Sequence, residues 1–184
     1  MFIRIVPLGI LREKIAETLC SSLSNAFNAK CKLLNGIPVP QESFNQWRKQ
    51  YDIGAILNKV GSDPSVTFID KNLPTLLLTE EDLYYNGMNF IFGIEEQERG
   101  ICILSLARLK PEFYGHKANS MMLNERAEKE AIHSIGHYFG LNHCRYTWCV
   151  MYPTASVDDI DRKQKHFCKT CELKLSMQGL NLSD

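Results

Sequence analysis

Three histidines with a fixed spacing are the residues of this sequence most suited to chemistry. His133 and His137 are four residues apart, so on a helix their imidazoles project from one face, one turn apart. Gly140 follows at the expected helix end, where a left-handed residue would turn the chain and bring His143 to the same point. Three neutral imidazoles can bind a zinc ion and leave its fourth position open, which is typical of catalytic zinc. We therefore predict a catalytic zinc site here; the alternative is three unrelated histidines.

Four cysteines after these histidines indicate a second metal site. Cys144 directly follows the last histidine, and Cys149 comes after four intervening residues. Cys168 and Cys171 then form a C-x-x-C pair. Two pairs of thiolates with a short connection make the ligand set of a closed structural zinc site. Together with the histidine site, this predicts two zinc ions per chain. The alternatives are buried apolar packing and a redox-active C-x-x-C pair. The other cysteines are expected in the core: Cys20, Cys31 and Cys102.

Composition limits the other classes of protein. A chain of 184 residues, 45% of them hydrophobic, is expected to form a single domain over residues 1–184 with a substantial core. The 21 basic and 21 acidic residues cancel, which argues against binding nucleic acid or an anionic membrane through bulk charge. No apolar run approaches the roughly 20 residues of a membrane helix, and no signal peptide is recognisable at the N-terminus. We therefore expect a cytoplasmic protein, where clustered cysteines bind metal more often than they form disulfides.

The elements that must position these residues follow from periodicity and turn residues. Helices are expected over residues 10–27, 43–60 and 124–139, with a short one from about residue 159. Strands are expected over 2–8, 30–36, either 66–69 or 73–78, 89–94 and 100–106. A turn is expected at 61–65, a hairpin between the last two strands and a loop over 111–120. This order predicts an α/β or α+β domain with a mixed sheet.

The chain resembles the archaemetzincins, a family of metzincin-like zinc peptidases. Their pattern H-E-x-x-H-x-x-G-x-x-H-C-x₄-C-x-M, followed by C-x-x-C, is specific and is met here except for the Glu. Weaker similarity at residues 48–51, 89–93 and 105–109 extends the resemblance over roughly residues 1–175. The matching positions are His133, Ser134, His137, Gly140, His143, Cys144, Cys149, Met151, Cys168 and Cys171.

The resemblance implies a compact fold and a set of roles. It implies a twisted mixed sheet of about five strands, a backing helix and an active-site helix that carries His133 and His137. Met151 would be the Met-turn residue beneath the zinc ligands, and the C-terminal part, 144–171, would hold the Cys₄ zinc. The strand near residues 102–105 would be the edge strand, where an extended peptide could pair by β-addition.

Ser134 departs from this pattern, because the family has Glu at this position. There the Glu acts as the general base that accepts a proton from the zinc-bound water. A serine hydroxyl is far too weak a base near neutral pH, and loss of a general base typically costs about 10²–10⁴ in rate. We therefore expect weak or absent activity unless another group replaces the carboxylate. The zinc ligands are unaffected, since a Glu at this position would not be one.

Few other groups in the sequence are placed to take that role. Glu130 lies one turn before Ser134, but helical side chains lean toward the N-terminus, so it should point away from the zinc as a solvated or capping carboxylate. His116 and Tyr114 precede the helix and are expected at the surface. Tyr152 could approach as an oxyanion donor, but a packed core position is the simpler expectation.

Three functions remain open from the sequence. The first is a zinc metallopeptidase acting on peptides or proteins, of weak or absent activity here. The second is a non-catalytic zinc-containing module that binds peptide or protein, and the third is a purely structural zinc protein. Lys163, Lys165 and Lys169 near the cysteines resemble a basic zinc ribbon, but aspartates precede them, so a solvated helix face is expected and no nucleic-acid partner. We expect no membrane partner and a monomer.

Overall fold

The computed structural model describes residues 1–11, 13–63, 66 and 70–180, and it confirms the α/β fold class with a mixed five-stranded sheet. The strand order is β2-β1-β5-β8-β7; the first four strands are parallel and β7 is antiparallel to β8. A small three-stranded sheet, β3-β4-β6, lies beside it. The strands are β1 Phe2–Pro7, β2 Lys30–Leu33, β3 Phe44–Asn45, β4 Gln50–Asp52, β5 Thr75–Thr79, β6 Leu83–Tyr84, β7 Gly93–Glu96 and β8 Ile101–Ser105.

Five α-helices and four short 3₁₀ helices are assigned in the described residues. The α-helices are α1 Glu13–Phe27, α2 Ile53–Ser62, α3 Ser120–Tyr138, α4 Val157–Arg162 and α5 Lys169–Met177. The 3₁₀ helices are Gln41–Ser43, Gln97–Arg99, Ala107–Leu109 and Pro111–Tyr114. None of the described helices is both long and apolar enough to cross a bilayer.

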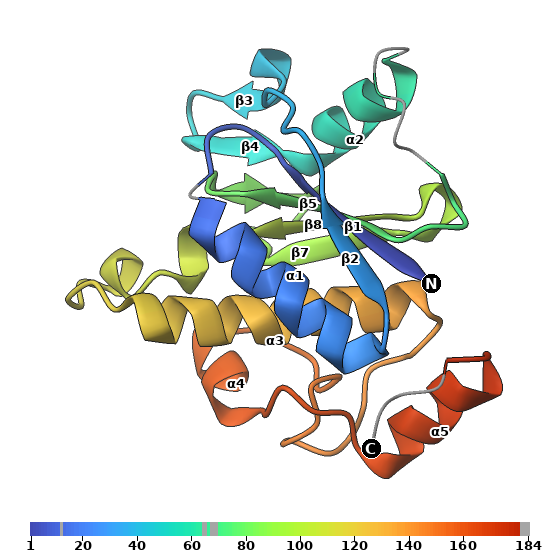
Figure 1. Ribbon diagram of the computed structural model, residues 1–184. Helices are drawn as coiled ribbons and strands as arrows, with labels where there is room; N and C mark the ends of the chain where they lie inside the picture. Colours follow the sequence, from blue (N-terminus) through green and yellow to red (C-terminus); the bar gives the residue numbers. More distant parts are fainter. Residues whose placement is uncertain (12, 64–65, 67–69, 181–184) are drawn as a thin grey trace.

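The sheet lies between two helical layers. Helices α1 and α3 cover one face, where the apolar side chains of α1, α3 and the sheet form the larger core (Figure 1). Helix α2 covers the opposite face and contributes Ile53, Ile56, Leu57 and Val60 to the smaller core, which also contains side chains of the sheet. Burial on both faces explains why β5 and β8 read as continuous apolar runs instead of alternating ones.

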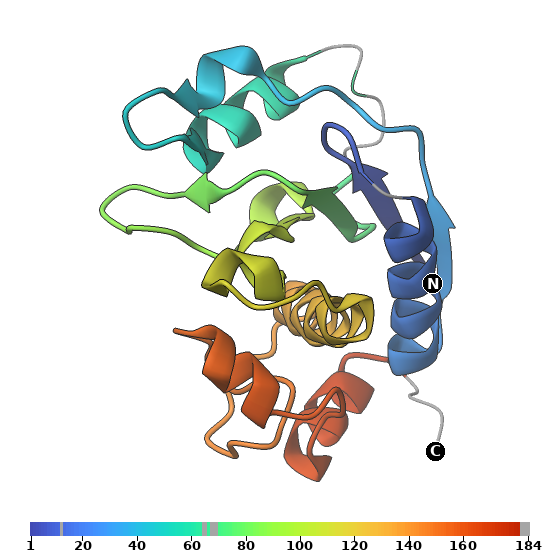
Figure 2. The same cartoon turned by 90° about the vertical axis from the view of Figure 1, so that its left-hand side faces the viewer.

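The segment after α3 forms a third layer on the side of α3 that faces away from the sheet. Figure 2 shows α3 end-on, with the sheet on one side and the loops, α4 and α5 on the other. Val150, Met151, Ile160 and Phe167 are buried in the larger core, so this segment packs against α3. Helix α3 is therefore held on both sides, which fixes the direction of the side chains near its C-terminal end.

Most expected elements are present, but the helix predicted over 43–60 is wrong in its first half. Residues 44–52 form the β3–β4 hairpin, and only α2 is helical. The Asn45 side chain accepts hydrogen bonds from the Trp47 and Arg48 amides, and Lys49 has a φ of 56°, so a tight turn replaces the helix. Trp47, expected on an apolar stripe, is 97% exposed.

Three further features differ from expectation: where α3 begins, the presence of α5 and the position of β8 in the sheet. Helix α3 begins with Asn119 as its N-cap, whose side chain accepts from the Met122 amide, five residues before the expected cap. Helix α5 was not predicted. The strand near residues 102–105 is not at the edge: β8 lies between β5 and β7, because the chain adds β7 outside it as a hairpin. The expected strand 66–69 and part of the turn 61–65 lie outside the described residues.

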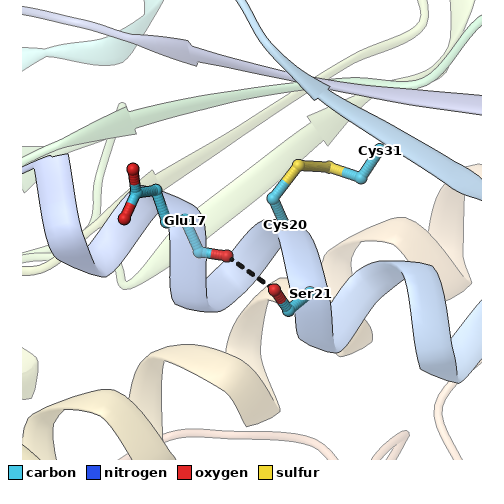
Figure 3. The surroundings of a disulfide bond; sticks show 4 residues. All are labelled: Glu17, Cys20, Ser21 and Cys31. Carbon is cyan, nitrogen blue, oxygen red and sulfur yellow. Dashed lines mark hydrogen bonds between the residues drawn. A yellow bond between two sulfur atoms is a disulfide. The ribbon is translucent and has the colours of Figure 1, made fainter.

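Cys20 and Cys31 were expected as core residues but form a disulfide that links α1 to β2 (Figure 3). Their Cα atoms are 5.3 Å apart because α1 packs over the strand that follows it. Both side chains are only partly buried, whereas Cys102 in β8 is buried as expected.

Candidate metal centre

The structure brings the three histidines together at the C-terminal end of α3. His133 and His137 project from one face of α3, and Gly140 follows with a φ of 75°, the left-handed conformation expected of it. The chain turns there, so that His143 meets the other two. One ring nitrogen from each histidine lies within 4.8 Å of the others. This is a convergent imidazole cluster of the kind predicted.

Hydrogen bonds fix which nitrogen of each helical histidine faces the centre of the cluster. His133 Nδ1 donates to the Val150 carbonyl at 2.9 Å, and His137 Nδ1 donates to the Leu141 carbonyl at 2.6 Å. In a neutral imidazole this leaves the lone pair on Nε2. The two Nε2 atoms are 3.0 Å apart. Two lone pairs at this distance need a cation between them, so the arrangement fits a metal ion.

The titration behaviour of these histidines agrees with a ligand role. Burial lowers the pKa of all three, most strongly that of His133. The ammonium of Lys163 lowers the pKa of His133 further. All three rings are therefore neutral near pH 7, the form in which imidazole binds a metal.

The four cysteine thiols form a second cluster directly beside the first. Cys144 Sγ is 3.7 Å from Cys168 Sγ, and Cys149 Sγ is 3.8 Å from Cys171 Sγ. Sulfur atoms about 2.3 Å from a tetrahedral zinc ion lie about 3.8 Å apart, so the spacing fits zinc. Burial raises the pKa of Cys149 to about 11, so this thiol would stay protonated without a cation.

Met151 packs against α3 between the two helical histidines. Its side chain is fully buried, and its sulfur would lie 2.6 Å from a Cβ placed on Gly136. A glycine between His133 and His137 therefore lets Met151 approach the helix backbone. The Met151 carbonyl accepts from the Cys144 amide at 2.9 Å, which ties Met151 to the cysteine cluster.

Two charged residues expected in solvent are buried beside the histidines. Glu130, expected as a solvated carboxylate, is 5% exposed and forms an ion pair of 2.7 Å with Lys163 Nζ. Lys163, expected on a solvated helix face, is fully buried because it follows α4 and turns toward α3. Lys163 Nζ also lies 3.4 Å from His133 Nδ1 and 2.9 Å from Thr154 Oγ1. Lys163 is thus not available to bind nucleic acid.

A cavity of about 580 Å³ opens over the histidine cluster. Its lining combines residues of α3 with β7, the edge strand, and the preceding segment. The sequence argument missed one of these residues: Glu95 of β7, whose carboxylate accepts a hydrogen bond from the Ser134 hydroxyl. The available signal was a carboxylate directly after the strand expected over 89–94. The polar lining residues near the cluster are Glu95, Glu130, His133, Ser134, His137 and His143.

The remaining candidates do not join the cluster. Tyr114 and His116 line a neighbouring cavity of about 770 Å³, and the Tyr114 hydroxyl donates to the Arg108 carbonyl. Tyr152 is half-buried directly after Met151, and its carbonyl lies 3.4 Å from Lys163 Nζ.

Comparison with known proteins places the chain in a family. Residues 23–177 match the sequence model of peptidase family M54. An archaemetzincin from Methanocaldococcus jannaschii is 38% identical over 183 residues, which cover 100% of this chain and 97% of the relative. An archaemetzincin from Thermococcus kodakarensis is 35% identical over 181 residues, with 94% of each chain covered.

Solved structures agree with the sequence relatives. A zinc-dependent peptidase from Methanocorpusculum labreanum superposes with a TM-score of 0.83 at 31% identity, over 94% of this chain and 99% of the other. The archaemetzincin of Archaeoglobus fulgidus gives 0.78 at 38% identity, over 95% and 99%. The chain therefore belongs to peptidase family M54, the archaemetzincins, a family of zinc-dependent metallopeptidases.

Proposed function

We propose that this chain is a zinc metallopeptidase in which His133, His137 and His143 hold the catalytic ion. The observation that carries the proposal is the pair of Nε2 atoms 3.0 Å apart, each fixed by a hydrogen bond from its own Nδ1. A zinc ion held there would supply a Lewis acid that polarises the scissile carbonyl and lowers the pKa of water.

A second, structural zinc ion is part of the proposal, with Cys144, Cys149, Cys168 and Cys171 as ligands. The sulfur–sulfur distances of 3.7 and 3.8 Å support it. This makes two ions in a single domain over residues 1–184. Because Cys144 follows His143, the structural ion would also restrict where the third imidazole points.

The substrate would be a peptide bound in extended form along β7. This strand is hydrogen-bonded to β8 on one side, and its residues line the cavity over the histidines. An extended peptide can add to such an edge through main-chain hydrogen bonds. The scissile carbonyl would then lie over the histidine cluster. We propose a monomer, since the cavity is built within one chain.

The alternative function is a non-catalytic module that binds peptide with the same cavity. Ser134 favours it, because the residue after His133 is no base in this chain. Hydrolysis is weak or absent in this chain unless a carboxylate elsewhere in the cavity accepts the proton.

The experiment compares zinc-loaded wild-type chain, Ser134→Glu and His137→Ala on a broad peptide library. A metallopeptidase predicts hydrolysis by Ser134→Glu that a chelator abolishes, and none by His137→Ala. A fully zinc-loaded Ser134→Glu chain that binds library peptides and cleaves none would leave the binding module as the function.

We also propose a cytoplasmic location, because the four cluster thiols bind metal only while reduced. The disulfide of Cys20 and Cys31 lies outside the cluster and is not part of this argument. Alkylation after mild metal removal in cell extracts should find the four cluster thiols reduced, and a disulfide among them would contradict the proposed location.

A further inference from the structure

We propose that Glu95 is a catalytic residue: it supplies, from the edge strand, the proton-accepting carboxylate that α3 lacks at Ser134. The inference rests on the proposed peptidase function and deepens it. In this proposal the Glu95 carboxylate of β7 accepts the proton, and the Ser134 hydroxyl of α3 orients that carboxylate.

Strand register directs the Glu95 side chain toward α3. Glu95 lies opposite Cys102 in the antiparallel β7–β8 pair, and residues directly opposite each other project from the same face. That face is the one under α3, because the Cys102 thiol lies 3.5 Å from the Ser134 carbonyl oxygen. The Glu95 carboxylate itself accepts a hydrogen bond from the Ser134 hydroxyl.

The same cavity holds Glu95, Ser134 and the three histidines. The only other carboxylate in its lining is Glu130, among the described residues. Glu130 is engaged by Lys163 Nζ at 2.7 Å and Thr154 Oγ1 at 3.2 Å, inside a buried ion pair. Glu95 is bound instead through a serine hydroxyl, which can orient a carboxylate without neutralising it.

The surroundings of Glu95 suit proton transfer near neutral pH. Burial raises its pKa to about 7, the nearby charge of Glu130 adds to the rise, and the Ser134 hydroxyl opposes it. The groups that face Glu95 are Ser134 and Glu130 from α3 and Cys102 from β8, with the histidines across the cavity. A general base works best when its pKa lies near the operating pH.

The proton balance of the step is simple. Water attacks the scissile carbonyl carbon, a C–O bond forms, and one water proton passes to a Glu95 carboxylate oxygen. The C–N bond then breaks, and Glu95 returns that proton to the leaving amine. Glu95 ends the cycle as a carboxylate, and Ser134 keeps its own proton throughout while it orients Glu95.

The test compares wild-type chain, Glu95→Gln, the double variant Glu95→Gln/Ser134→Glu and Glu98→Gln, all zinc-loaded to the same content. Glu98 is a matched control, since it is an exposed glutamate three residues further along. We expect Glu95→Gln to lower kcat/KM by about 10²–10⁴, the usual effect of losing a general base. Glu98→Gln should stay within about twofold of wild type, and the double variant should regain hydrolysis from the helical carboxylate.

A second readout does not depend on activity. Infrared titration of the carboxyl band lost in Glu95→Gln should give a midpoint near pH 7 before zinc enters the histidine site. Zinc should lower that midpoint, because a nearby cation favours the carboxylate. The inference is overturned if zinc binding leaves the titration midpoint of the Glu95 carboxyl unchanged, or if Glu95→Gln has the kcat/KM of wild type.

The outcomes separate this inference from the proposed function. If the double variant cleaves peptides and the wild type does not, the cavity is a peptidase site and the role of Glu95 is wrong. If neither cleaves any peptide at full zinc content, the proposed peptidase function is wrong, and so is the catalytic role of Glu95.

Discussion

The Ser134 hydroxyl of α3 donates a hydrogen bond to the Glu95 carboxylate of β7, next to the three histidines. The two side chains come from the helix and the edge strand, which both line one cavity. The hydroxyl stands at the helical position where the pattern H-E-x-x-H predicts a carboxylate, and the strand supplies a carboxylate beside it.

Glu95→Gln should stabilise the chain at high pH while the histidine site is metal-free. The pKa of Glu95 is about 7 in the folded chain, against about 4.3 for an unfolded glutamate, so the folded state binds more protons between these values and stability falls as pH rises through them. Gln removes this dependence. Because Glu95 is half-buried, we expect a gain of about 1–3 kcal/mol at pH 8 and none near pH 4, measured by urea unfolding. An equal effect at both pH values, or the same gain in Glu98→Gln, would contradict it.

Removing the C-x-x-C pair should weaken zinc binding at the neighbouring histidines. Cys168→Ala/Cys171→Ala deletes half of the cysteine cluster, and the adjacent Cys144 then no longer restrains His143. We expect the zinc affinity of the histidine site to fall at least about tenfold, the usual effect of removing a group that orients a metal ligand. Competition with a chelator measures this affinity. Cys20→Ala/Cys31→Ala removes two cysteines outside both clusters and serves as the control. Unchanged affinity in the double variant would show that the cysteine cluster does not position His143.

Gly136→Ala should be destabilising because of Met151. The added methyl group would lie 2.6 Å from the Met151 sulfur, so one of the two must move. Overpacking of this kind typically costs about 1–3 kcal/mol, measured here by chemical unfolding. In a Met151→Ala background the clash is gone, so Gly136→Ala should cost nothing there and can gain helix propensity. Equal costs in both backgrounds would mean that the contact does not limit residue 136.

Lys163→Met should cost far more than an exposed lysine substitution. It leaves the buried Glu130 without its ion-pair partner, and removing one member of such a pair typically costs about 3–5 kcal/mol. Lys163→Met/Glu130→Leu removes both charges and should recover most of that loss. Lys165→Met, at a half-exposed ion pair of 3.4 Å, should cost less than about 1 kcal/mol. If the double variant is no more stable than Lys163→Met, the pair is not the source of the effect.

Local spacing was enough to predict that the three histidines converge and that the four cysteines form a cluster. The four-residue interval of His133 and His137, the left-handed Gly140 and the paired cysteines each act over a few residues. Periodicity also identified α1, the mixed sheet and most strands of the central sheet. The strand expected over 89–94 starts only at Gly93 and runs to Glu96. It failed over residues 44–52, where apolar residues recur at helical spacing but the chain turns. The Asn45 side chain and the left-handed Lys49 stabilise that turn.

The contacts that decide the chemistry are tertiary and could not be read from spacing. Glu95 meets Ser134 only because β7 folds back onto β8 under α3. Lys163 reaches Glu130 only because the segment after α4 turns inward, and the disulfide of Cys20 forms because α1 lies over β2. Each of these pairs joins elements whose packing follows from the whole core.

The most direct test of the zinc-peptidase account is the number of zinc ions per chain, measured by native mass spectrometry on protein purified with zinc. We predict two ions in wild type, one in His137→Ala and one in Cys168→Ala/Cys171→Ala. A wild-type chain that holds one ion, keeps it in His137→Ala and loses it in the cysteine variant would contradict the account, because the histidine cluster would then hold no metal.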